Sequence, residues 1–83
     1  MVNRTQHALL RALLHFAKND RHPCVVTLAA ALGLSCNAVD RTVWELDTLG
    51  LVDGDRLRLS FSGLAAAAAL ESRERGRHAR SAA

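Results

Sequence analysis

The chain has 83 residues, of which 49% are hydrophobic and three are aromatic, and its formal net charge is +3. A chain of this length forms one small domain, near the lower limit for folding on a single core, and its apolar share excludes a disordered protein. Four arginines against two glutamates in residues 71–83 supply +2 of the net charge, so the remainder of the chain is close to neutral.

The N-terminal segment predicts neither export nor membrane insertion. Its most apolar stretch, LLRALLHFA, is interrupted by Arg11 and His15, whereas a signal peptide or a membrane span needs an unbroken apolar run. Cys24 and Cys36 are the two cysteines, too few for a disulfide framework. We therefore expect a soluble, cytoplasmic protein.

Residues 4–18 have the spacing of an amphipathic helix. One apolar face is predicted by the three- and four-residue spacing of Leu9, Leu10, Leu13, Phe16 and Ala17. The opposite side carries a basic stripe of Arg4, His7, Arg11, His15 and Lys18. A solvated face is the simpler interpretation of this stripe, and a row of phosphate contacts is the alternative.

The next segments predict a strand and two helices. Residues 24–26 are partly β-branched and predict a brief strand after a loop at 19–23. Thr27 is a suitable N-cap for a helix that ends at Gly33 in a left-handed conformation. Ser35 then caps a third helix, which ends near Gly50.

A β-hairpin and a last helix follow. Asp53-Gly54-Asp55 lies between residues 51–52 and 56–59, and Asp-Gly between alternating residues is a strong hairpin signal. Ser60 or Ser62 caps a helix that runs through the alanine-rich segment. We expect a domain over residues 1–75, with the order α-β-α-α-β-β-α, and a disordered basic tail over residues 76–83.

Residues 27–64 contain four features that follow one another along the chain. A helix with Leu28-Ala29 leads through Leu32-Gly33-Leu34 into LSCNAVDRTVWELDTLGLV, then the short hairpin VDGDRLRL, then Ser60-Phe61-Ser62-Gly63. In this order they resemble the winged helix-turn-helix DNA-binding domain of the broad MarR/ArsR-like type of transcriptional regulator. The resemblance implies a mostly α fold with a small β-wing, and double-stranded DNA as the partner.

In such a fold the third helix enters the major groove. Its outward side would then present Asn37, Arg41, Trp44 and Thr48. Asn37 can pair with adenine, Arg41 with guanine, and Asp40 can accept a hydrogen bond from cytosine. Two further sets would hold phosphates: the helix N-terminus at Ser35, and the wing residues Arg56 and Arg58.

The third helix has an unexpected charge for a partner of DNA. Arg41 is its one basic residue, against Asp40, Glu45 and Asp47, which leaves a net charge of −2. DNA affinity comes mainly from phosphate contacts, which can lie elsewhere. The alternative function is a winged-helix protein-interaction module, an adaptor, anti-repressor or inhibitor, that binds through Trp44 and these acids.

Simpler interpretations also apply to individual residues of this helix. Trp44 could cover the edge of the core, and Arg41 could pair with Glu45 one turn on. Cys36 lies in the first helical turn, where a thiol becomes more acidic, although a small filler residue is the default. The set of His22, Cys24 and Cys36 lacks the spacing of a metal site.

The alanine-rich helix is apolar on two sides, so it needs two partners. We expect one side to contact its own domain and the other to form a homodimer. The expected dimer residues are Leu64, Ala66, Ala67 and Leu70. The sequence contains no catalytic set or phosphate-binding loop, so it predicts a small DNA-binding repressor that is not an enzyme and needs no metal or other cofactor.

Overall fold

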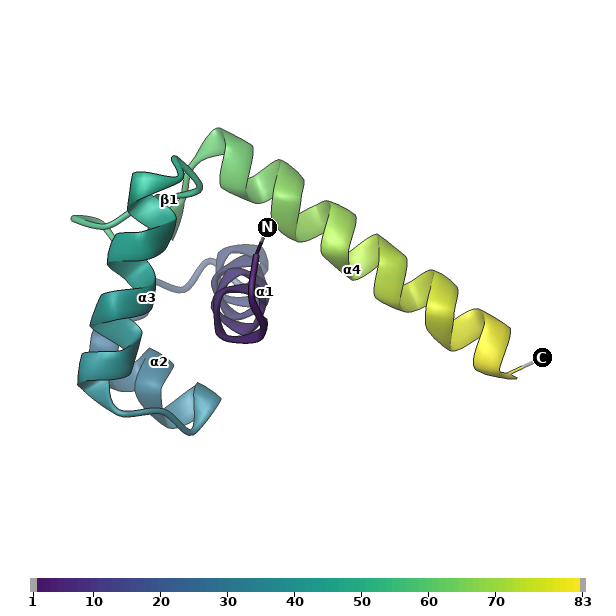
Figure 1. The fold of residues 1–83 in the computed structure, drawn as a ribbon, viewed down its shortest axis with the longest axis horizontal. Coiled ribbons are helices and arrows are strands. Elements are labelled where there is room, and N and C mark those ends of the chain that lie inside the picture. Colours follow the sequence, from purple (N-terminus) through teal and green to yellow (C-terminus); the bar gives the residue numbers. More distant parts are fainter. Residues whose placement is uncertain (1, 83) are drawn as a thin grey trace.

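The computed structural model describes the backbone of residues 2–82 and the side chains of residues 2–73. Within this range the chain folds in the order α1-α2-α3-β1-β2-α4 (Figure 1). The helices are α1 (Arg4–Lys18), α2 (Val25–Leu32), α3 (Cys36–Thr48) and α4 (Phe61–Ala82), and the strands are β1 (Val52–Asp53) and β2 (Arg58–Leu59). The fold is therefore mostly helical with a small antiparallel sheet, which confirms the predicted class.

Helix α1 has the bounds that its apolar spacing predicted. The Asn3 side chain accepts the Gln6 N–H at 2.8 Å, and the Gln6 side chain accepts the Asn3 N–H at 3.1 Å. This capping box satisfies two of the N–H groups that the helix end leaves open. Leu9, Leu10 and Leu13 of the predicted apolar side are buried. Leu14, which was not assigned to that side, is buried as well, whereas Ala17, which was assigned to it, is exposed.

Helix α2 corrects two expectations. The strand predicted over residues 24–26 is wrong, and the N-cap is Cys24 rather than Thr27, which lies in the first turn. The Leu28 N–H donates to the Cys24 carbonyl at 3.0 Å. β-Branched residues favour a strand by at most about 1 kcal/mol, and burial of Leu28 and Ala29 in the core outweighs this preference.

A short turn joins α2 to α3. Gly33 ends α2 with a φ of 68°, a left-handed conformation that glycine adopts without steric cost. The Ser35 Oγ then accepts the Ala38 N–H at 3.1 Å and caps α3. Both expectations for this turn are confirmed.

The predicted hairpin is present, with a longer turn than expected. β1 and β2 are antiparallel, and Val52 lies opposite Leu59. Residues 54–57 form the turn, where Leu57 has a φ of 50°. The strand alternation predicted for residues 56–59 is therefore wrong at Arg56 and Leu57, which belong to the turn.

The start of α4 depends on Ser60 and Gly63. The Ser60 Oγ accepts the Gly63 N–H at 3.0 Å and donates to the Gly50 carbonyl at 2.6 Å. The Ser60 N–H donates to the Leu51 carbonyl at 3.0 Å. A Cβ atom at Gly63 would overlap this same carbonyl oxygen, so only glycine lets α4 lie so close to the segment that precedes the hairpin.

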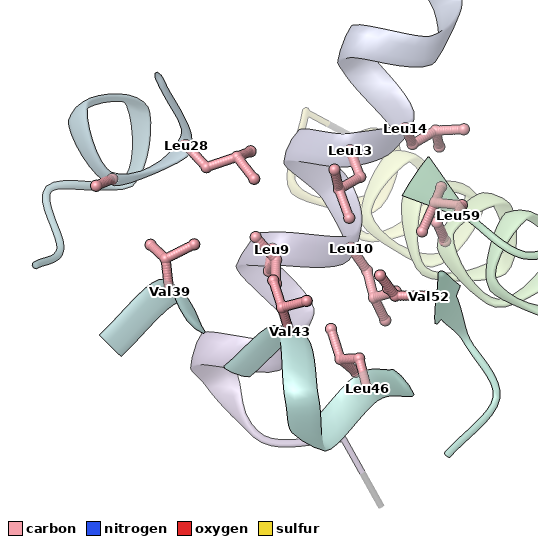
Figure 2. Packing of buried hydrophobic residues seen from close by; sticks show 12 residues of the cluster. Leu9, Leu10, Leu13, Leu14, Leu28, Val39, Val43, Leu46, Val52 and Leu59 are labelled. Carbon is pink, nitrogen blue, oxygen red and sulfur yellow. The ribbon is translucent and has the colours of Figure 1, made fainter. Parts of the chain in front are cut away.

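The core is built around α1. This helix packs against α2, α3, β2 and α4, and Figure 2 shows its leucines between the side chains of α3 and those of the hairpin. The core residues outside α1 are Leu28, Ala29, Val39, Val43, Leu46, Val52, Leu59 and Ala67. Every element of the described chain therefore contributes to one core.

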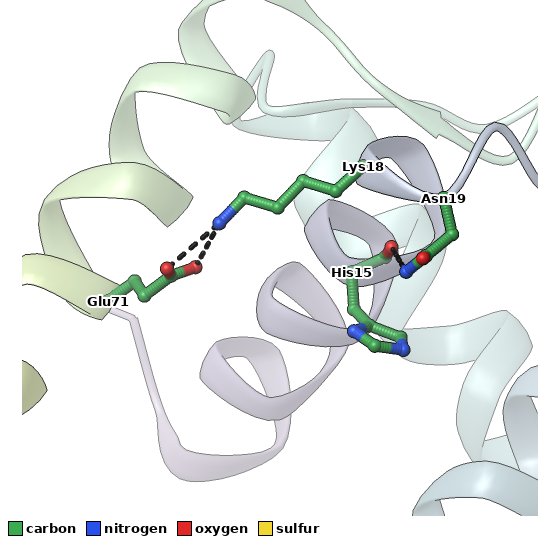
Figure 3. A network of polar contacts seen from close by, with 4 residues as sticks. All are labelled: His15, Lys18, Asn19 and Glu71. Atoms are coloured by element: carbon green, nitrogen blue, oxygen red, sulfur yellow. Dashed lines mark hydrogen bonds and ion pairs between the residues drawn. The ribbon is translucent and has the colours of Figure 1, made fainter.

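Helix α4 lies against α1 through its first turns and then runs away from the body (Figure 1). The Lys18 Nζ lies 2.8 and 3.0 Å from the two carboxylate oxygens of Glu71, and beside it the Asn19 side chain donates to the His15 carbonyl at the end of α1 (Figure 3). The boundary expected between residues 75 and 76 falls within α4. The side chains of the expected basic tail, residues 76–83, lie outside the described residues.

Candidate functional site

The outward side of α3 carries the residues that the sequence singled out. Burial of Val39, Val43 and Leu46 fixes the rotation of the helix, because residues three and four apart share a face. The remaining side is exposed and presents Asn37, Arg41, Trp44 and Thr48. Both the predicted base-reading pair and the tryptophan are therefore open to solvent.

Trp44 is 71% exposed. The interpretation that it covers the edge of the core is therefore wrong. Tryptophan is highly buried on average, so an exposed one that stacks on no aromatic ring of the described residues is a candidate contact residue.

Two of the three acidic side chains of α3 have structural partners. The Gln6 side-chain amide donates to Glu45 at 3.3 Å, which joins α1 to α3. The Gly54 N–H donates to the Asp47 carboxylate at 3.0 Å, which joins the hairpin turn to α3. Glu45 and Asp47 therefore have a structural role, because they hold α1 and the hairpin turn against α3.

The pair expected between Arg41 and Glu45 does not form, and Arg41 makes no ion pair with any residue whose side chain the structure describes. Asp40 likewise has no ion pair or side-chain hydrogen bond among the described residues. Arg41 and Asp40 are therefore the two charged groups of α3 left available for an external partner.

The hairpin places its two arginines in different settings. Arg56 belongs to the turn, with its Nε 4.0 Å from Asp53. Arg58 lies in β2 opposite Asp53. Both side chains are exposed, so both are accessible as the phosphate-contact expectation requires.

A small pocket lies between α3 and the hairpin turn, with a volume of about 140 Å³. Its polar lining comes from Asp40 and Asp47 of α3 and Asp55 of the turn, and Trp44 and Leu57 supply apolar surface. Basic side chains do not occur among its lining residues. This pocket could not be predicted from the sequence, because Asp55 meets α3 only through the path of the turn.

Helix α4 presents a different apolar surface from the expected one. Ala67 is fully buried in its own core, so its assignment to a dimer interface is wrong. Ala66 and Leu70 are half-buried on the same side, whereas Leu64 is 40% exposed. Phe61, which was not assigned to the interface, is 92% exposed. Its three-residue spacing from Leu64 is the sequence signal that would have identified it.

The N-terminal end of α4 borders a cavity of about 470 Å³. Phe61 and Leu64 line it together with Leu13 of α1 and Leu57 of the hairpin turn. The apolar surface of α4 therefore continues onto the body of the protein.

The two cysteines are free and exposed. The Cys24 Sγ lies 3.2 Å from the Thr27 hydroxyl, and this hydrogen bond, followed by one from the Thr27 backbone, lowers the pKa of the Cys24 thiol. Among the described residues, His, Cys, Asp and Glu do not form a group of three or more that could hold a metal ion. The same residues include no helix long and apolar enough to cross a membrane.

The arrangement thus defines a small helical domain with an exposed helix α3 beside a short hairpin. No family model, curated protein or solved structure matches the chain.

Proposed function

We propose that this chain is a sequence-specific DNA-binding protein, a small regulator of the winged helix-turn-helix type that acts as a repressor. The observation that carries the proposal is the exposed side of α3, where Asn37 and Arg41 point outward and Arg41 has no ion pair among the described residues. A helix held on one side by the core and open on the other has the layout of a recognition helix.

The side chains of α3 suit the edges of bases in the major groove. Arg41 can donate two hydrogen bonds to guanine, and Asn37 can pair with adenine. Asp40, which lacks a partner in the described part of the chain, can accept from cytosine. Good contacts of this kind discriminate between bases by about 1–3 kcal/mol each.

Phosphate contacts would come from outside the acidic part of α3. Ser35 caps the helix, and the N–H groups beyond it favour an anion. Arg56 and Arg58 are exposed on the hairpin. Lys18 is less suitable, because Glu71 already holds its ammonium group.

A homodimer would be formed by the exposed side of α4, with Phe61 and Leu64 in place of the buried Ala67. Two recognition helices related by a twofold axis would contact half-sites about one turn of DNA apart, roughly 34–36 Å. The expected operator is therefore a pseudo-palindrome, and occupation of a promoter by the dimer would repress transcription by steric exclusion.

The test is a salt titration of binding to the DNA upstream of the protein's own gene, with an unrelated duplex as the reference. Specific binding that weakens steeply with salt is expected, since each phosphate contact releases counterions. Arg41→Ala should weaken binding to the specific duplex by about tenfold or more and leave the unrelated duplex unaffected. Arg21→Ala, an exposed arginine outside α3, is the matched control.

Equal and weak binding to both duplexes, or none, would exclude the proposal. If Arg41→Ala weakened binding to both duplexes equally, Arg41 would contact a phosphate and would not read a base.

A protein-docking role is the second candidate function. It is favoured by one specific observation, the pocket in which Trp44 stands among three carboxylates. Such a surface repels phosphates and suits a basic partner.

A further inference from the structure

The pocket between α3 and the hairpin turn has the size of one side chain. Its volume of about 140 Å³ is well below the roughly 300–1,000 Å³ of pockets that hold drug-sized ligands. It exceeds several times the roughly 30 Å³ that one water molecule occupies. A single long side chain of a partner therefore fits the pocket better than a free metabolite does.

The charges of the pocket have one sign. Asp40 and Asp55 have no ion pair or side-chain hydrogen bond among the described residues, while Asp47 holds the Gly54 N–H. Two carboxylates at the surface are therefore left for a cationic group. A phosphate group would be repelled at this point, so the pocket does not hold a phosphate of DNA.

The apolar part of the pocket selects among cations. Trp44 is 71% exposed, and Val25 and Leu57 line the pocket beside it. A guanidinium group is planar, stacks on an indole ring and binds carboxylates through two hydrogen bonds, whereas an ammonium group is a strongly hydrated point charge. The methylene groups of an arginine would lie on the two aliphatic side chains.

We propose that this pocket is a docking surface for an arginine side chain carried by a segment of a partner protein. The guanidinium group stacks on Trp44 and pairs with Asp40 and Asp55. Exposed tryptophans of this kind are common binding hot spots, and charge complementarity fixes the orientation of the segment. The proposal rests on the second candidate function and names the chemistry of its partner.

The position of the pocket also predicts regulation of DNA binding. Trp44 lies on the same side of α3 as Asn37 and Arg41, so a segment docked on it would occupy the space of a duplex in contact with these residues. The arginine segment and DNA would then exclude each other. This consequence depends on the proposed DNA binding, whereas the docking itself does not.

The test uses the fluorescence of Trp44, which is the only tryptophan in a chain without tyrosine. The probe is a short synthetic peptide with arginine among alanine and leucine residues, and its two matched versions carry glutamine or lysine in place of arginine. The arginine peptide should shift or quench the emission in a saturable way, and added salt should weaken its binding.

The variants test the carboxylates. Asp40→Asn combined with Asp55→Asn should weaken binding of the arginine peptide by about tenfold or more, because measured couplings between close charge pairs at an interface reach this size. Asp20→Asn is the control, since Asp20 is exposed outside the pocket and has a positive φ that asparagine also adopts. Unchanged binding is expected there, and circular dichroism verifies that each variant is folded.

The inference fails if the arginine peptide causes no saturable change, or if the double variant binds it as tightly as the natural chain. Equal binding of the glutamine or the lysine peptide would also overturn the assignment to arginine. The titration contains no DNA, so its outcome is independent of the DNA-binding proposal. If the upstream duplex does bind, the arginine peptide should displace it, and simultaneous binding of both would refute the exclusion.

Discussion

The substitution Gly63→Ala tests how closely α4 approaches the segment before the hairpin. The added methyl group would overlap the Leu51 carbonyl oxygen and would lie 3.2 Å from a methyl carbon of Leu59. The carbonyl belongs to the backbone and accepts the Ser60 N–H, so it cannot move aside without weakening the start of α4.

The expected loss of stability follows from three contributions. Forcing a methyl group into a packed site costs about 1–3 kcal/mol, and a weakened hydrogen bond between Ser60 and Leu51 adds about 0.5–1.5 kcal/mol. Alanine in place of glycine within a helix increases the free energy of unfolding by about 0.5–1 kcal/mol, which offsets part of this loss. The net destabilisation is therefore about 0.5–4 kcal/mol, and each kcal/mol lowers the Tm of a domain of this size by roughly 4–8 °C.

Urea unfolding followed by far-ultraviolet circular dichroism measures this change. Ala65→Gly, at an exposed position of the same helix, gives the helix-propensity difference alone and should cost about 0.5–1 kcal/mol. If Gly63→Ala instead stabilises the protein by a similar amount, α4 does not lie against Leu51 as described.

Three further substitutions test individual hydrogen bonds. Asp47→Ala removes the acceptor of the Gly54 N–H and should cost about 1 kcal/mol in urea unfolding. Asn3→Ala removes the N-cap of α1 and should also cost about 1 kcal/mol. Thr27→Val removes the hydroxyl that lowers the pKa of Cys24, so the pH midpoint of thiol alkylation by iodoacetamide should rise.

The Asp47 and Thr27 substitutions each have a control. Asp55→Ala alters an exposed carboxylate of the hairpin turn and should change stability by less than about 0.5 kcal/mol. A loss equal to that of Asp47→Ala would show that the position of the turn does not depend on the Asp47 bond. The alkylation is carried out in a Cys36→Ser background, so that only Cys24 reacts. An unchanged midpoint would mean that the Thr27 hydroxyl is not the cause of the acidity.

The elements predicted well are those with local signals. α1 has a three- and four-residue leucine pattern together with a capping residue, and α3 has Ser35 at its start. The cap of α4 also has a local signal: Ser60 or Ser62 is predicted, and Ser60 is the cap. Gly63 enters the prediction only through the resemblance, and its physical reason is that it admits a neighbouring carbonyl group.

The errors came from competing local and tertiary preferences. Cys24-Val25-Val26 favours a strand locally, but Val25, Leu28 and Leu32 have helical spacing and turn toward the core. That longer pattern was the better signal. Ala67 could not be assigned to a side of α4 from the sequence, because a run of alanines has no polar residue to mark the exposed face.

The candidate site was predictable only along α3. A helix reveals its outward residues by period alone, so the exposure of Asn37, Arg41 and Trp44 followed from the apolar positions. The pocket depends instead on the longer turn of the hairpin, which places Asp55 in the same pocket lining as Asp40. Turn length is set by the register of two very short strands, and their sequence does not determine it.

The central place of α1 has a consequence for synthesis of the protein. This helix precedes α2, α3, β2 and α4 in the chain, yet it packs against all of them, and the last core residue, Ala67, follows only in α4. At about 5–20 residues per second, the leucines of α1 wait several seconds for this final partner. During that interval part of the apolar side of α1 stays uncovered, and the domain completes its core only as α4 leaves the ribosome.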